Sequence, residues 1–303
     1  MERRVNVCEI ITEQIIRQLE QGQIPWQKPW VGGSEEARSH NTGKPYSLLN
    51  QLLLAQPGEY ITFNQCSKEG GRIKKGSKAK YVYFWKPCMV PETDADGKPI
   101  LDADGKQKVK TVPFLRGYQV FHLSDTEGIA EKWAESLPEN PARTKEEIDR
   151  VLTEYVTREG IKLKADKETD RAFYSPQYDL IQIPCINQYT ESAEYYSTGF
   201  HEAVHSTGHP KRLHRFEVND KNAAFGSENY SKEELTAEIG AASILHQLGI
   251  GTPGSLKNSA AYVQNWLKAL KDDNRLIISA AGRAEKAVRM ILGQRNEQEP
   301  AEA

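Results

Sequence analysis

Cysteine is scarce in this sequence of 303 residues, and long apolar runs are missing from it. No stretch offers the roughly 20 apolar residues of a membrane-spanning helix, and no apolar segment follows the first charges as in a signal peptide. The cysteines are far apart and form no C-x-x-C pair, which excludes a zinc knuckle and a disulfide framework. They are Cys8, Cys66, Cys88 and Cys185. We therefore expect a protein of the reducing cytoplasm that has no membrane partner.

An excess of positive charge is also lacking. The 40 Lys and Arg residues stand against 42 Asp and Glu residues, which gives a formal net charge of −2. This balance excludes a chain that binds nucleic acid through its overall charge, so any such binding must come from a local basic patch. The content of 38% hydrophobic and 27% charged residues is typical of a globular protein, and the length is enough for two domains.

The most informative stretch is His201-Glu202-Ala203-Val204-His205, which reads H-E-x-x-H. Residues four apart share one face of an α-helix, so both imidazoles can bind one ion. Glu202 lies roughly 100° further around the helix, where it can face a water on the ion. Zinc lowers the pKa of that water to about 7, and a carboxylate can accept its proton. The motif predicts zinc ligands at His201 and His205 and a catalytic base at Glu202; a surface helix with two histidines is the simpler alternative.

We expect the motif helix to be capped by Thr190 or Ser192 and to stop near Gly208. A catalytic zinc takes a third protein ligand and keeps one position for water. His209 and His214 miss the spacing of the H-E-x-x-H-x-x-G-x-x-H pattern, so we expect them at the surface or beside a ligand.

The third ligand is expected from a helix that opens near Ser231. Glu234 and Glu238 lie four apart on one face of this helix, so one can bind the metal while the other orients a ligand histidine. Ser231 and Glu234 also fit a capping box, which would leave Glu238 as the ligand. We favour Glu234, with Glu238 as the alternative and Glu233 less favoured by helical phase.

A basic run interrupted by glycines precedes an aromatic strand at Tyr81–Trp85. Cations neutralise phosphates and exposed rings stack on bases, so this pattern suits single-stranded nucleic acid; a solvated hairpin is the simpler alternative. Trp26 and Trp30 can stack on bases or fill a core, and for each single tryptophan we favour the core. The repeated Asp94–Lys98 and Asp102–Lys106 segments predict tight turns of a protruding hairpin. The basic run consists of Lys68, Arg72, Lys74, Lys75, Lys78 and Lys80.

Helical and strand periodicities alternate along the chain, which predicts an α+β protein of two domains. Residues 131–144 are charged and contain two prolines, so we place the linker there. The predicted boundaries are 1–130 for the first domain, 145–295 for the second and 296–303 for a disordered acidic tail.

Several motifs resemble those of the ArdC-type antirestriction proteins of conjugative plasmids. In the N-terminal part these are Trp26–Trp30, Asn41–Tyr46, Asn50, Lys74–Gly76 and Tyr118–Phe121. In the C-terminal part they are Ala172–Tyr174, Asp179–Pro184, His201–Gly208, Arg212–Arg215, Glu233–Glu238 and Ser259–Tyr262.

The resemblance implies an N-terminal single-stranded-DNA-binding domain and a C-terminal zincin-like metallopeptidase domain that carries the H-E-x-x-H helix. It implies a role in protecting transferred plasmid DNA from host restriction. DNA binding is then expected at Trp30, Asn41, Tyr46, Arg72, Lys74, Lys75, Lys78 and Lys80.

Three hypotheses stay open. In the first, the chain binds single-stranded DNA and is an active zinc peptidase. In the second, it coats DNA and its metal site is structural. In the third, it cleaves a host protein, such as a restriction component, and DNA binding is incidental. Zinc is the expected metal, and manganese or another divalent ion is the alternative.

Overall fold

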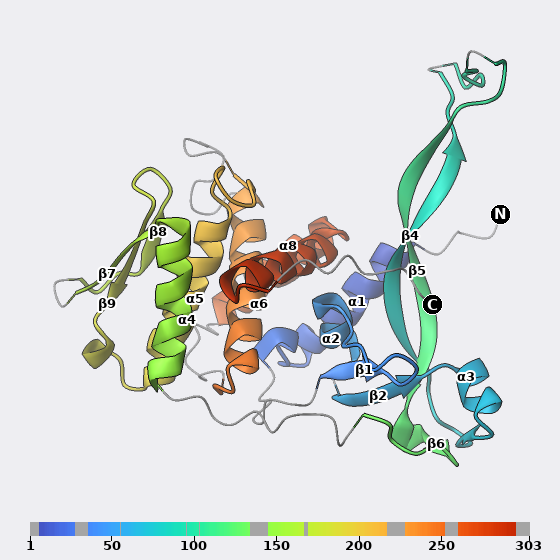
Figure 1. Cartoon of the computed structure of the whole chain (residues 1–303), viewed down its shortest axis with the longest axis horizontal. Coiled ribbons are helices and arrows are strands. Elements are labelled where there is room, and N and C mark those ends of the chain that lie inside the picture. The colour runs from blue at the N-terminus through green and yellow to red at the C-terminus, as the bar shows by residue number, and fades with distance from the viewer. Residues whose placement is uncertain are drawn as a thin grey trace. The chain divides into compact units, whose positions relative to one another are not determined.

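The computed structural model describes residues 6–27, 36–54, 56–94, 96–102, 104–133, 145–166, 169–216, 228–251 and 260–294. Contacts divide the chain into two compact units. The first unit comprises the residues up to Tyr60 together with Ala130–Asn296, and the second contains Ile61–Ile129. Helices and sheets are mixed, as expected for an α+β chain (Figure 1). Within these ranges no helix has the length and apolar character needed to cross a membrane.

The N-terminal helix of the first unit packs on helices from the other end of the chain. Helix α1 (Val7–Glu20) buries Ile11, Ile15 and Leu19 along one side. The hydroxyl of Thr12 donates to the carbonyl of Asn274, 2.8 Å away, just after helix α7 (Ala260–Asp272). In the short 3₁₀ helix η1 (Pro25–Gln27), Trp26 is buried with its ring centroid 5.2 Å from that of Trp266 in α7. Trp26 therefore fills a core, the position that we favoured over base stacking.

A small β–α–β unit completes this part. Strand β1 (Ala37–Ser39) runs parallel to β2 (Gly58–Ile61), and helix α2 (Leu48–Leu54) connects them. The buried carboxylate of Glu59 contacts His40 Nδ1 and accepts the backbone N–H groups of Lys132 and Trp133. It thereby fastens the first residues of the predicted linker. Residues 134–144 of that linker and the predicted tail lie outside the described residues.

The C-terminal part of the first unit places helices against a three-stranded sheet. Strand β9 (Leu180–Pro184) is central, parallel to β7 (Lys162–Asp166) and antiparallel to β8 (Phe173–Ser175). Its helices are α4 (Lys145–Glu159), α5 (Ser192–Thr207), α6 (Glu228–Gln247) and α8 (Leu276–Ile291), with the 3₁₀ helix η3 (Ile186–Gln188) before α5. Their shared core includes Tyr155, Ile181, Phe200, Val204 and Ile244. Helices α1 and α2 also pack against α8, within the same unit. The predicted domain boundaries stay a prediction.

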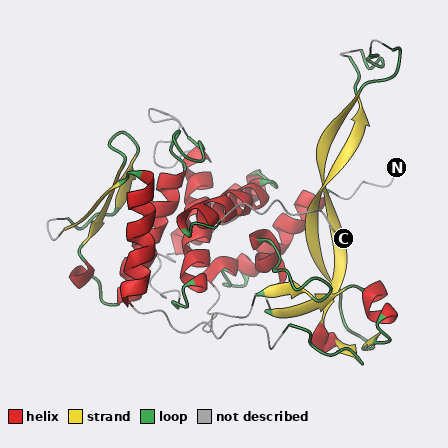
Figure 2. Ribbon diagram, in the orientation of Figure 1, coloured by secondary structure: helices red, strands yellow, loops and turns green. Residues whose placement is uncertain are grey.

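The second unit is built around a long two-stranded ribbon (Figure 2). Strand β4 (Lys80–Pro91) pairs antiparallel with β5 (Val109–His122) in unbroken register. At its base lie helix α3 (Phe63–Lys68), the pair β3 (Arg72–Ile73) and β6 (Thr126–Glu127), and the 3₁₀ helix η2 (Leu123–Asp125). Ile61, Cys66 and Leu123 form a small buried cluster there.

The tip of the ribbon contains the predicted tight turns. The carboxylate of Asp94 accepts the backbone N–H groups of Asp96 and Lys98, and Asp102 repeats this with Asp104 and Lys106. The glycine of each turn, at 97 and 105, has a φ near +79°, a conformation that side chains disfavour. The repeated sequence therefore forms two turns with the same hydrogen bonds.

Candidate metal centre

Helix α5 presents both histidines of the H-E-x-x-H motif on one face. It begins after Glu191, whose extended backbone caps it without a side-chain bond, so the expected caps at Thr190 or Ser192 are wrong. It ends at Thr207 with Gly208 as C-cap, as expected. The one-turn spacing brings the Nε2 atoms of His201 and His205 within 3.0 Å of each other. The two rings meet at 78°, so both Nε2 atoms point to one place.

Glu234 on helix α6 supplies the third side of a triangle. Its two carboxylate oxygens lie 3.5 Å from His201 Nε2 and 3.3 Å from His205 Nε2. All three side chains offer one ligand atom within 4.8 Å of the others. The capping-box alternative for Glu234 is wrong, because α6 already begins at Glu228 and Ser231 lies inside it.

This triangle has the size of a metal coordination shell. A tetrahedral ion with bonds of about 2.0 Å sets its ligands about 3.3 Å apart, and an octahedral ion with bonds of about 2.1 Å sets neighbouring ligands about 3.0 Å apart. The two Nε2 atoms lie 3.0 Å apart, and the two oxygens of Glu234 lie 3.3 and 3.5 Å from them, which is the range of such ligand separations. Three convergent ligands also leave coordination positions for water or substrate. The donor set of two imidazoles and one carboxylate therefore fits a catalytic divalent ion.

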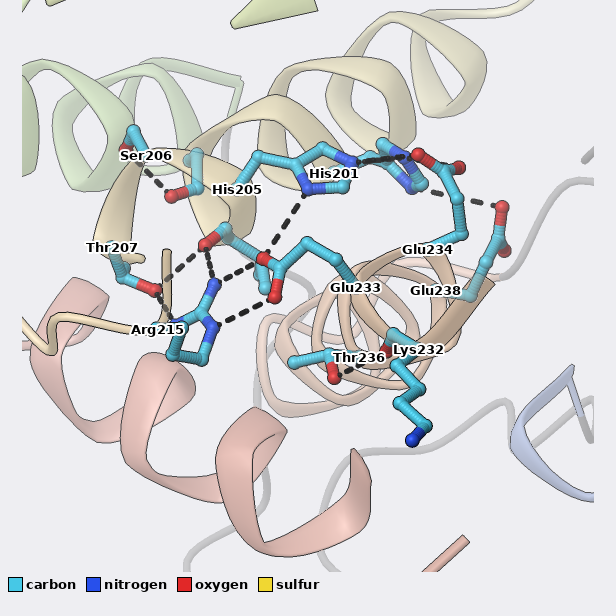
Figure 3. A network of polar contacts seen from close by, with 12 residues as sticks. His201, His205, Ser206, Thr207, Arg215, Lys232, Glu233, Glu234, Thr236 and Glu238 are labelled. Atoms are coloured by element: carbon cyan, nitrogen blue, oxygen red, sulfur yellow. Dashed lines mark hydrogen bonds and ion pairs between the residues drawn. The ribbon is translucent and has the colours of Figure 1, made fainter. Parts of the chain in front are cut away.

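Each ligand histidine turns its other nitrogen toward a further carboxylate (Figure 3). Glu238 lies 3.6 Å from His201 Nδ1, and Glu233 lies 3.4 Å from His205 Nδ1. Such carboxylates fix the tautomer and the direction of a metal-binding imidazole. Glu238 thus occupies the orienting position that we considered for it beside Glu234. Glu233, which helical phase disfavoured as a ligand, lies beside the second imidazole.

The carboxylates control the charge of the imidazoles. Burial lowers the pKa of both histidines, but hydrogen bonds to the acids outweigh it. The pKa of His201 is raised through Glu234, and that of His205 is raised well above its ordinary value through Glu233 and Glu234. Burial raises the pKa of Glu234, yet its bonds to both imidazoles leave that pKa far below the usual range. The charge distribution therefore favours anionic carboxylates around a shared positive centre.

Arg215 holds the carboxylate of Glu233 and the end of helix α5 in place, a role that the sequence patterns do not indicate. Its guanidinium donates to both oxygens of Glu233, at 3.0 and 2.5 Å. It also donates to the Val204 carbonyl and to the Thr207 hydroxyl, at 2.7 and 2.6 Å. With a side chain only 5% exposed, Arg215 connects the end of α5 to the acid that orients His205.

Arg212 fixes the same turn to the sheet. Its guanidinium donates to the Ser206 carbonyl, to the Tyr174 hydroxyl and to both oxygens of Asp179. The Arg212–Arg215 motif contributed to the family resemblance, but nothing in its local spacing indicates these partners. His209, expected at the surface or beside a ligand, is buried and accepts the Lys211 N–H through Nδ1.

Close approach of α5 and α6 brings the ligands together. Gly240 of α6 faces Val204 of the motif, and a Cβ at 240 would lie only 2.8 Å from a methyl group of Val204. The glycine therefore allows the contact that presents Glu234 to the histidines. Glu202 lies on α5 between them and is 8% exposed, so the predicted base is largely shielded from bulk water.

The predicted DNA-binding residues divide between the two units. Arg72 forms an ion pair with Glu127, and the Lys74 ammonium donates to the Ser124 carbonyl. Lys75 and Lys78 are exposed, whereas burial lowers the pKa of Lys80. These five share the second unit, while the exposed Asn41 and the half-buried Tyr46 belong to the first. Trp30 lies outside the described residues.

Family models match both the N-terminal and the C-terminal part of the chain. A family model described as the N-terminal domain of anti-restriction factor ArdC matches residues 5–121, and one described as zincin-like metallopeptidase matches residues 151–283. A DNA primase TraC of Escherichia coli is 36% identical over 301 residues, 96% of this chain. This chain spans only 20% of that primase. An uncharacterized protein of Sinorhizobium fredii, y4eC, is 28% identical, with 96% of this chain and 93% of that protein covered.

Solved structures extend the similarity over the whole chain. The metal-free crystal structure of the antirestriction ArdC protein from plasmid R388 has a TM-score of 0.73 at 29% identity, covering 96% of this chain and 98% of that chain. The Mn(II)-bound structure has a TM-score of 0.72 at 29% identity, covering 97% and 100%. Together with the matched motifs, these findings show that this chain belongs to the ArdC-type antirestriction family, with an N-terminal ArdC domain followed by a zincin-like metallopeptidase domain.

Proposed function

We propose that this protein binds single-stranded DNA, protects incoming plasmid DNA from restriction, and hydrolyses a peptide bond at the centre on α5 and α6. The observation that carries the enzymatic part is the convergence of His201, His205 and Glu234, with a separate carboxylate behind each imidazole. A site that only stabilises the fold closes with four protein ligands, whereas this one has three among the described residues.

The proposed chemistry assigns one task to each residue. His201, His205 and Glu234 hold a divalent ion, zinc or manganese, which when bound supplies Lewis acidity toward water and a peptide carbonyl. Glu202 accepts the proton of the attacking water and returns it to the leaving amine. Glu233 and Glu238 keep the imidazoles directed at the ion. The ArdC protein of R388, in its Mn(II)-bound form, supports a divalent ion at such a centre.

The DNA-binding part rests on the second unit. Lys74, Lys75 and Lys78 lie together in the loop between β3 and β4, next to a ribbon rich in aromatic side chains. Cations beside rings suit an unpaired strand, because phosphates are neutralised and bases can stack. The cytoplasm is the proposed location, where incoming DNA meets host restriction enzymes.

The test separates the two activities. Glu202→Ala should keep metal and DNA binding but lose peptide hydrolysis, measured on a protein substrate. If this variant still protects incoming plasmid DNA in cells, hydrolysis has no part in protection. Charge reversal of Lys74, Lys75 and Lys78 to Glu should abolish single-strand binding while metal binding persists. Reversal of the exposed Lys162, Lys164 and Lys286 in the first unit gives the matched control. Equal binding by both triple variants would remove the DNA assignment.

A further inference from the structure

The ribbon of the second unit has an unusual charge distribution. Strands β4 and β5, of 12 and 14 residues, contain no Asp or Glu. They contain four lysine or arginine residues: Lys80, Lys86, Lys110 and Arg116. Acidic residues begin only beyond the strands, at Glu92 and in the two turns of the tip. The strands themselves therefore contribute only positive formal charge.

Register shows that all four cations lie on one face. The pairs Lys80↔Val120, Phe84↔Arg116, Lys86↔Phe114 and Val90↔Lys110 run through the ribbon without a bulge. Directly paired residues project to the same side, and side chains alternate along each strand. The even-numbered positions of both strands thus form one face, which we name the cation–ring face. The odd-numbered positions form the opposite face, which carries no charged residue.

Rings and cations alternate on the cation–ring face. Arg116 lies across from Phe84, and its guanidinium carbon is 5.3 Å from the ring centroid of Tyr118. The rings of Phe84 and Tyr118 meet edge to face at 5.8 Å. Phe114 lies across from Lys86 and is 56% exposed. Each of these rings therefore has a cation either directly across the ribbon or at the next position on the same face.

The opposite face is a different surface. Tyr81 and Tyr83 stack there, and Gly117 lies directly beneath the Tyr83 ring, where a Cβ would approach it to 2.9 Å. Trp85 on this face is 55% exposed, almost the same as Phe114 on the other. The ribbon thus offers two exposed rings of matched exposure, one among cations and one without them.

We propose that single-stranded DNA lies along the cation–ring face, with its phosphates against Lys86 and Arg116 and a base stacked on Phe114. This inference rests on the proposed DNA binding and extends that site from the lysine loop along the ribbon. An unpaired strand fits because it offers phosphates and free base faces together. An acidic protein would match the cations, but it gives no reason for the exposed ring of Phe114 across from Lys86. Beyond the strands the tip carries five carboxylates beside Lys98, Lys106 and Lys108, so the stretch without acidic residues ends at Glu92.

The experiment compares rings on the two faces of the full-length protein. Phe114→Ala should weaken binding of a labelled oligo(dT) longer than about 16 nucleotides by roughly 5- to 150-fold. Trp85→Ala, the matched control, should change it less than about twofold, and Phe114→Trp should retain it. Arg116→Gln should reduce the slope of log affinity against log salt by about 0.7.

Several outcomes overturn the inference. One is an equal loss of oligo(dT) affinity in Trp85→Ala and Phe114→Ala. Another is unchanged affinity in both variants while charge reversal at Lys74, Lys75 and Lys78 abolishes binding. The second result leaves the proposed function intact. Equal affinity for duplex DNA, with an equal loss in Phe114→Ala, also overturns it, because paired bases cannot stack on the ring. Absence of oligo(dT) binding by the unchanged protein removes the proposed DNA function itself.

Discussion

Arg215 offers the sharpest test of how the metal centre is held. Its side chain is 5% exposed and donates to four oxygen atoms: both oxygens of Glu233, the Val204 carbonyl and the Thr207 hydroxyl. Arg215→Ala leaves the carboxylate of Glu233, only 17% exposed, without its cation. Removing one partner of a buried pair costs about 3–5 kcal/mol. Such a loss corresponds to a fall in melting temperature of roughly 6–20 °C for a unit of this size.

The same change should weaken the metal centre. Without Arg215, Glu233 is no longer held at His205 Nδ1, and loss of such an orienting partner weakens metal binding by about 10- to 100-fold. Affinity is measured by competition with a chelator, and stability by thermal unfolding of the metal-free protein. Arg215→Lys keeps the charge but not the paired geometry, so its loss should be intermediate.

Arg150→Ala is the control, because Arg150 pairs with Glu154 on the surface of α4 and both side chains are about two-thirds exposed. This exposed pair is expected to contribute less than about 0.5 kcal/mol. An Arg215→Ala protein that melts within a degree of the unchanged protein and keeps its metal affinity would refute the reasoning.

Three further outcomes are expected. Glu234→Ala should remove bound metal, measured by elemental analysis, whereas Glu238→Gln should weaken it only about 10- to 100-fold; the reverse order would exchange their roles. Because the imidazole pKa values are raised, the protonated histidines stabilise the metal-free fold below about pH 6.5, and this contribution disappears as pH rises through the folded values. As pH rises through the pKa values of the two folded-state imidazoles, metal affinity should increase and binding should release protons. Calorimetric titration with metal in two buffers measures this proton release, and a metal affinity that does not change with pH would contradict the prediction. Gly240→Ala should cost about 1 kcal/mol net, since overpacking against Val204 outweighs helix propensity, whereas Gly282→Ala, with open space, should stabilise by about 1 kcal/mol in denaturant unfolding.

Helical periodicity predicts those features of the metal centre that depend on the spacing of nearby residues. The four-residue interval in H-E-x-x-H sets two imidazoles on one face, and the same interval separates Glu234 from Glu238. Arg215 and Glu233 lie 18 residues apart and meet only after α5 turns back at Gly208, so no local pattern indicates their contact. The capping pattern predicts a helix start near Ser231, whereas α6 begins three residues earlier, at Glu228.

Packing between distant segments was the part that sequence patterns did not reach. Trp26 contacts Trp266 within the first unit, and the sequence around Trp26 favours a core position without indicating which residue it contacts. The sequence shows that the four cations of the ribbon all stand at even-numbered positions. Only the register of β4 with β5 shows that these positions lie on the same face.

One unit contains helices from the N-terminal and from the C-terminal part of the chain, and this has a practical consequence. A fragment that starts at residue 145 loses α1 and η1, and it would open to water the apolar surface of Trp266 and its neighbours in α7. A cut before residue 145 is therefore expected to give a less stable zincin-like half that exposes apolar surface and aggregates. Removal of residues 61–129 instead keeps α1, η1 and α7 in the same chain as the candidate metal centre.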